Sequence, residues 1–183
     1  MKSIPFSSLF TSGLCYFKSP ISYMLSFMLL LQGGAWKVPE GIQPVDHLNV
    51  SQYLGKWYEI ARLDNFMERG LADVVESYSL RKDGDIHVET RGWDTKRNKE
   101  KVIVSKLRFF SNQRTGHLKA IFNPFIYGSY VLFHLEPDCS VALVCSYSKD
   151  YLWILARKPV LEKEELDTYL IIAREKGFAE KKL

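Results

Sequence analysis

From Gln52 onward, short runs of apolar and polar residues are separated by turn-forming residues. In the run at 85–93, Ile86 and Val88 alternate with His87 and Glu89, which is the two-residue period of a strand with one buried face. The preceding "KDGD" carries the Asp-Gly pair typical of a tight hairpin. The whole pattern predicts eight strands, at 53–63, 74–81, 85–93, 101–110, 117–122, 128–136, 140–147 and 151–157.

The period changes after Pro159, where "PVLEKEELDTYLIIAREKGF" begins. Acidic residues fill the first turns of this segment and basic residues the last, which suits the dipole of a helix. Gly177 follows as a typical residue just beyond a helix end. Four apolar residues recur at helical spacing: Leu166, Tyr169, Leu170 and Ala173. The segment therefore predicts one amphipathic helix of about four turns.

Eight sequential strands with short connections predict an all-β, up-and-down antiparallel β-barrel. Closing the sheet removes the exposed edges that an open meander would leave. A barrel of about eight strands has an interior that side chains fill or that holds one small ligand. The last strand is apolar on both faces, since Leu152 and Ile154 alternate with Trp153 and Leu155. We expect one face to line the interior and the C-terminal helix to cover the other.

Composition is that of an ordinary globular protein, with 46% hydrophobic and 25% charged residues among 183. Such a length suffices for one domain with a substantial core. The formal net charge is +4, and the basic residues are interspersed with acidic ones rather than clustered. This pattern argues against a nucleic-acid partner.

Residues 1–35 differ from the rest of the chain. Ile21–Leu31 is an apolar run of the length found in signal peptides, too short to span a bilayer well. Gly33 and Ala35 are small residues suited to a cut after Ala35. The pattern predicts an export signal at 1–35 and a folded domain at 36–183, and an uncleaved membrane segment is the alternative.

Three cysteines are present, and the leader contains one of them, Cys15. Cys139 and Cys145 lie at opposite ends of one predicted strand, about 20 Å apart at the rise of an extended chain. A disulfide needs Cα atoms within about 7 Å. We therefore expect these two cysteines not to pair with each other.

Three segments carry a family resemblance: "YLGKWYEIARLDNFMERGL" from Tyr53, "NPFIYGSYVL" from Asn123 and "DYLWILARKP" from Asp150. Together with the eight strands and the helix, they resemble the lipocalins over residues 45–178. The similarity is greatest to the bacterial lipocalins, an outer-membrane lipoprotein group related to apolipoprotein D. The motif residues that carry it are Gly55, Trp57, Asp150, Tyr151 and Arg157.

The resemblance implies that Trp57 closes one end of the barrel and that Arg157 lies across it. A guanidinium over an indole contributes about 0.5–2 kcal/mol. Asp150 and Tyr151 are expected near the same end. In contrast to the bacterial group, no cysteine stands directly after the apolar leader, where the sequence reads "QGGAWKVPEG". A lipid anchor is therefore doubtful, and a soluble exported form in the periplasm or at the outer membrane is favoured.

The resemblance also implies a small hydrophobic ligand, a fatty acid or a lysophospholipid, held in the barrel and carried across an aqueous compartment. Aromatic residues of the connecting loops are expected at the mouth, where they contact ligand, membrane surface or partner: Phe66, Phe125 and Tyr127. Interior candidates are Phe109, Phe122, Tyr130 and Leu132, with Tyr78 and Trp93 behind them. The cations considered for an anionic head group are Arg69, Arg91, Lys106 and Arg108. A one-residue slip in register would reverse the interior assignments.

No combination of nucleophile and base is visible, and the four histidines lack metal-ligand spacing. We therefore predict a carrier without catalysis, cofactor or metal. Two alternatives stay open. A lipid-modifying enzyme would have to use Cys145, His134, Glu59 or Tyr130, and an envelope interaction module would dock a partner through Phe66 and Phe125.

Overall fold

The computed structural model describes residues 36–111, 114–123 and 125–179. The leader predicted at 1–35, with its proposed cleavage site and Cys15, lies outside the described residues. Within those ranges no helix has the length and apolar character needed to cross a membrane.

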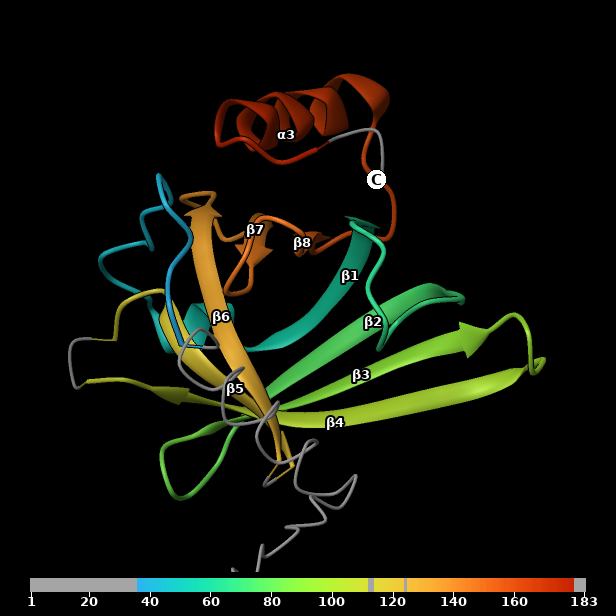
Figure 1. Cartoon of the computed structure of the whole chain (residues 1–183), viewed down its shortest axis with the longest axis horizontal. Coiled ribbons are helices and arrows are strands. Elements are labelled where there is room, and N and C mark those ends of the chain that lie inside the picture. Colours follow the sequence, from blue (N-terminus) through green and yellow to red (C-terminus); the bar gives the residue numbers. More distant parts are fainter. Residues whose placement is uncertain (1–35, 112–113, 124, 180–183) are drawn as a thin grey trace, which may run out of the picture. The chain divides into compact units, whose positions relative to one another are not determined.

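The eight predicted strands follow one another around a closed antiparallel barrel (Figure 1). Each strand pairs with its neighbours in the sequence, and the first pairs with the last to close the sheet. The strands are β1 (Gly55–Arg62), β2 (Leu71–Leu80), β3 (Ile86–Asp94), β4 (Lys99–Phe109), β5 (His117–Asn123), β6 (Ile126–Leu135), β7 (Val141–Cys145) and β8 (Leu152–Ala156). The predicted up-and-down β-barrel is confirmed.

Alternation along each strand separates an inner from an outer set of residues. On β3, Ile86, Val88 and Thr90 are buried, whereas His87 between them is only partly buried. Ile86 lies opposite Leu107 of β4, and both belong to one apolar cluster inside the barrel. Outward residues of β6, β7 and β8 form a second cluster on the other side of the sheet.

Helix α3 (Lys163–Glu175) covers this second cluster from outside, as predicted. Tyr169 is buried against the sheet, and Phe178 stacks on Phe133 of β6 with ring centroids 5.4 Å apart. Gly177 adopts a φ of 84° just after the helix, a left-handed conformation that a residue without a Cβ accepts readily. The turn at this glycine sends Phe178 back onto the barrel.

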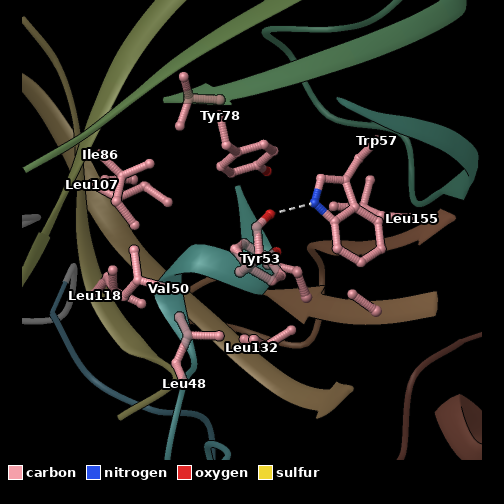
Figure 2. Packing of buried hydrophobic residues seen from close by; sticks show 14 of the residues in the cluster. Leu48, Val50, Tyr53, Trp57, Tyr78, Ile86, Leu107, Leu118, Leu132 and Leu155 are labelled. Carbon is pink, nitrogen blue, oxygen red and sulfur yellow. Dashed lines mark hydrogen bonds between the residues drawn. The ribbon is translucent and has the colours of Figure 1, made fainter. Parts of the chain in front are cut away.

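A short helix that was not predicted, α2 (Val50–Tyr53), precedes β1. Asn49 caps it by accepting a hydrogen bond from the backbone of Gln52. Tyr53 was expected to begin a strand, yet it ends this helix and is fully buried inside the barrel. Its carbonyl accepts a hydrogen bond of 2.8 Å from the indole nitrogen of Trp57 (Figure 2). Helix and strand therefore meet at the base of the barrel.

The base of the barrel is sealed by Trp57 and Arg157. Trp57 has no exposed surface, and the Arg157 guanidinium carbon lies 3.8 Å from the centroid of its ring. Gly55 has a φ of 98° and lies close enough to Arg157 for a Cβ to come within 3.5 Å of it. The guanidinium also donates hydrogen bonds of 2.6–3.2 Å to backbone carbonyls, those of Gln52, Tyr53, Leu54, Lys56 and Cys139.

The expectation that Asp150 and Tyr151 lie near this base is wrong. They precede β8, and Arg157 follows it, so the strand separates them. Since Trp153 pairs with Arg62 at the far end of β1, Tyr151 lies at the opposite end of the barrel from Trp57. Here Tyr151 is 3.2 Å from the hydroxyl of Tyr147.

Candidate functional site

Side chains on the inner wall of the barrel differ in how completely they are buried. Leu118 and Leu132, on the inner wall, are completely buried. Ile103, Phe122 and Trp153 also face inward, but each is only partly buried. An inward side chain that keeps exposed surface borders space that protein atoms do not fill, so the inner wall offers apolar surface to a ligand.

The connection from β1 to β2 lies across the mouth. Trp153 of β8 donates a 2.8 Å hydrogen bond to the Glu68 carboxylate in this connection. Lys101 of β4, a strand on the other side of the barrel by strand order, donates to the carbonyl of Met67 at 2.5 Å. Asn65 donates to Glu68 at 2.7 Å and is itself buried. These bonds turn Glu68 into the interior, where only 5% of its surface remains exposed.

Tyrosine hydroxyls form a polar chain through the apolar interior. Tyr53 and Tyr130 are 2.5 Å apart at their hydroxyl oxygens, and Tyr130 is 3.0 Å from Tyr78. The Tyr78 hydroxyl donates to the carboxylate of Glu76. Burial raises the pKa values of Tyr78 and Tyr130 well above the usual 10. These hydroxyls therefore stay protonated and serve as hydrogen-bond donors.

Three carboxylates meet where this chain ends. One oxygen each from Glu59, Glu68 and Glu76 lies within 4.8 Å of the other two. Burial, followed by repulsion from Glu68, raises the pKa of Glu59 to about 7 and that of Glu76 to about 8. Arg62 partly offsets the effect on Glu59, to which it donates a hydrogen bond. The interior therefore contains a compact acidic group beside one guanidinium.

A β-bulge in β1 brings Arg62 to the inside. Glu59 pairs with the inward Leu155, and the register shifts before Ala61 pairs with Ile154 on the outer face. Arg62 then lies opposite Trp153 and faces inward like Glu59, although it is three positions further along the strand. If the chain alternated from Glu59 without a bulge, Ala61 would face inward and Arg62 outward.

A cleft of about 580 Å³ opens beside the same segment. The β1–β2 pairing ends at Tyr58 and Val75, and the lining includes Glu59, Arg62 and Asp73. The cleft therefore gives solvent a lateral approach to the residues of the bulge.

The predicted interior residues are placed inward with one exception. Phe109, Phe122, Tyr130, Leu132 and Tyr78 belong to, or pack against, the cluster inside the barrel.

Trp93 is the exception. It is 44% exposed and alternates with the buried Gly92 and Asp94, so it faces outward from β3. Its prediction as an interior residue is wrong, because alternation along β3 turns Gly92 toward the interior and Trp93 away from it.

The predicted mouth residues divide into two groups. Phe66 and Phe125 are 68% and 71% exposed, on the β1–β2 and β5–β6 connections, which an up-and-down barrel places at one end. Tyr127 lies in β6 rather than in a loop and stacks on Trp36 at 4.6 Å between ring centroids, away from the inner cluster. The expectation that Tyr127 belongs to a mouth loop is therefore wrong.

None of the four cations proposed for a ligand head group contacts the inner carboxylates. Arg69 pairs with Asp64 in the exposed part of the connection, and Arg91 pairs with Glu89 and Glu100 on the outer face. Lys106 and Arg108 both pair with Asp85. Sequence reasoning missed Arg62 and Lys101, which do reach the inner wall and its mouth loop.

The candidate residues for catalysis are not gathered in one place. Cys145 belongs to the cluster beneath α3, where burial raises the pKa of its thiol to about 12. His134 lies near Tyr169 and hydrogen-bonds Glu136. Cys139 is free and buried in the inner cluster. Of the proposed catalytic set, only Glu59 and Tyr130 belong to the interior.

Comparison with known proteins assigns the family. A family model described as a lipocalin-like domain matches residues 48–183, and the chain belongs to this family. It is 40% identical to outer membrane lipoprotein Blc of Vibrio cholerae over 151 residues, covering 81% of this chain and 88% of that protein. Bovine apolipoprotein D is 26% identical over 137 residues, covering 68% of each chain. The predicted resemblance to the bacterial lipocalins, with apolipoprotein D more distant, is confirmed.

A solved structure gives the same fold. Insecticyanin from the tobacco hornworm Manduca sexta superposes with a TM-score of 0.63 at 16% sequence identity. The match covers 79% of this chain and 82% of that one. At this identity the likeness concerns the fold alone.

Proposed function

We propose that this protein is an exported carrier that holds a fatty acid or lysophospholipid inside its barrel, for storage or transport in the cell envelope, without catalysing a reaction. The observation that carries the proposal is the inner wall, where apolar side chains such as Ile103 and Phe122 face inward yet keep exposed surface. Burying an acyl chain there contributes about 0.8 kcal/mol per CH₂. Similarity to an outer membrane lipoprotein supports the envelope location, and residues 1–35 would supply export.

A pair of variants on one strand tests the site. Ile103 faces the lumen, whereas its neighbour Val104 is 49% exposed on the outer face of β4. Ile103→Trp should weaken lysophospholipid binding at least about tenfold by filling the space, about 1.4 kcal/mol. Val104→Trp adds the same volume outside and should leave binding unchanged. Native mass spectrometry after lipid loading measures both variants.

Two results would count against the carrier. Absence of fatty-acid or lysophospholipid binding below about 100 µM would contradict it directly. Equal losses in both variants would show that the barrel interior is not the binding site. Tryptophan fluorescence gives a second readout, because a ligand in the lumen should perturb Trp153, which faces inward, and not Trp93, which faces out.

The exposed aromatics at the mouth support contact with a membrane surface from which the lipid is collected. Phe66 and Phe125 lie on different connections at the same end. Joint substitution, Phe66→Ser with Phe125→Ser, should reduce sedimentation with phosphatidylglycerol vesicles while uptake of detergent-dispersed lipid persists. Equal sedimentation of this variant and the unmodified protein would remove membrane contact from the proposal.

A further inference from the structure

We propose that Glu59, Glu68 and Glu76 form a calcium site inside the barrel. The inference goes beyond lipid carriage, because it concerns a metal ion held by the protein's own carboxylates. The three residues come from β1, the β1–β2 connection and β2. Only the fold brings them together, since they are spaced irregularly along the chain.

The distances among the carboxylates fit a calcium ion. Their three oxygens lie within 4.8 Å of one another. Calcium binds oxygen at about 2.3–2.6 Å, so two ligands on opposite sides of the ion are separated by about 4.6–5.2 Å. Magnesium binds at about 2.0–2.1 Å, keeps several waters and usually takes one or two carboxylates, so three carboxylates favour calcium. The separations are therefore compatible with one calcium ion shared by the three carboxylates.

One ligand atom is left without a partner. The Glu59 side chain is only 4% exposed, and its Oε2 accepts no hydrogen bond from any residue that the structure describes. Leaving a buried acceptor unsatisfied costs about 1–3 kcal/mol, and more for a charged group. A cation between Glu59 and the other two carboxylates would satisfy this atom.

Neighbouring residues orient the carboxylates, and the group as a whole has a net negative charge. Glu68 accepts hydrogen bonds from Asn65 and Trp153, and Glu76 accepts one from Tyr78. Such outer contacts orient the ligands of metal sites. With all three carboxylates ionised and the adjacent Arg62 guanidinium positive, the group carries two net negative charges, which a divalent ion neutralises.

The lateral cleft borders the site and is the route by which an ion would approach it. Its lining contains Glu59, Asp64 and Asp73 together with Arg62, so acidic groups outnumber the one cation on the side from which an ion would approach Glu59. A route of this kind completes the requirements for a metal site: oxygen ligands, fitting distances, oriented carboxylates and access.

Calorimetric titration of the full chain with CaCl₂ at pH 8, after treatment with EDTA and its removal, tests the site. We expect one ion per chain with a Kd of about 10⁻⁶–10⁻⁴ M, and a higher Tm in calcium. Glu59→Gln and Glu76→Gln should each weaken binding at least tenfold and abolish the calcium-dependent rise in Tm. Glu89→Gln is the matched control, because Glu89 pairs with Arg91 on the outer face.

Absence of saturable binding at 1 mM calcium (about 10 times the weakest expected Kd) would overturn the site and show that the carboxylates are neutralised by protons alone. Equal weakening in Glu89→Gln would overturn it as well. Circular dichroism and a cooperative melt in EDTA verify that each variant is folded. The titration contains no lipid, so its failure leaves the carrier proposal standing, and failure of lipid binding leaves the calcium site standing.

Discussion

Glu76 is a buried carboxylate, and replacing it with glutamine should make the barrel more stable at alkaline pH. Glutamine has nearly the shape of a protonated glutamic acid but does not ionise. Glu76 lies beside Glu59 and Glu68 and accepts a hydrogen bond from the hydroxyl of Tyr78, whereas Arg62 pairs with Glu59. Ionised Glu76 therefore has repulsive neighbours and little hydration.

The magnitude follows from the pKa. Burial raises the pKa of Glu76 from the usual 4.5 to about 8. At about 1.36 kcal/mol per pH unit, this interval corresponds to about 5 kcal/mol as an upper limit, because local rearrangement lowers the real cost. A raised pKa gives stability that is present below pH 4.5 and is lost as pH rises through about 8. Glu59, with a pKa of about 7, adds a loss of the same sign.

Urea unfolding from pH 5 to pH 9 in EDTA measures this effect. We expect Glu76→Gln to match the unmodified protein near pH 5 and to exceed its free energy of unfolding by about 2–5 kcal/mol at pH 9. Glu89→Gln, on the outer face of β3, controls for the loss of an acid anywhere on the chain. Parallel pH curves for Glu76→Gln and the unmodified protein would refute the reasoning, since they would mean that Glu76 titrates alike in folded and unfolded chains.

Three further predictions concern the scaffold. Arg157→Lys should lower the free energy of unfolding by about 1–3 kcal/mol, because lysine cannot donate to the same set of carbonyls while covering the indole, and an unchanged urea midpoint would contradict this. Gly116→Ala should destabilise by more than about 2 kcal/mol, since its Cβ would lie 2.4 Å from the Leu132 carbonyl. Gly84→Ala, with φ of 84° but open space around it, should cost about 1–2 kcal/mol, and equal losses for the two glycines would count against the contact. Both described cysteines are buried, so a thiol reagent at pH 8 should modify them only upon unfolding, and rapid labelling of the folded barrel would contradict their placement.

The fold could be predicted because alternation is local information. Each strand shows its own period of two, and the change of period after Pro159 marks the helix. Registers are not local, and Trp93 illustrates the difference. Its size and apolar character favour the interior, but its pairing with Ala72 across β2 and β3 places it on the outer face. Helix α2 was missed because four residues are too few to show a helical period.

The grouping of the three interior carboxylates could not be predicted, although Tyr78 and Tyr130 beside them were. Glu68 belongs to a connection whose course depends on hydrogen bonds from Trp153 of β8 and Lys101 of β4. Both residues are distant in sequence from Glu68 and from each other. Glu59 was considered only as a possible catalytic acid, and Glu76 was not singled out. Charged residues in a strand pattern are ordinarily assigned to solvent, so sequence reasoning has no signal for carboxylates that turn inward.

The bulge at Ile60 decides which side chains of β1 face the lumen and therefore how polar the lumen is. Upstream of it, odd-numbered side chains of β1 look inward, and downstream even-numbered ones do. If the same residues paired without the bulge, the side chain facing inward beyond Glu59 would be the methyl of Ala61 in place of the guanidinium of Arg62, and the carboxylates would lose their cationic neighbour. The bulge thus separates a lumen whose acids have a cationic neighbour from one with bare acids, which makes this position a natural point at which related barrels could diverge in what they carry.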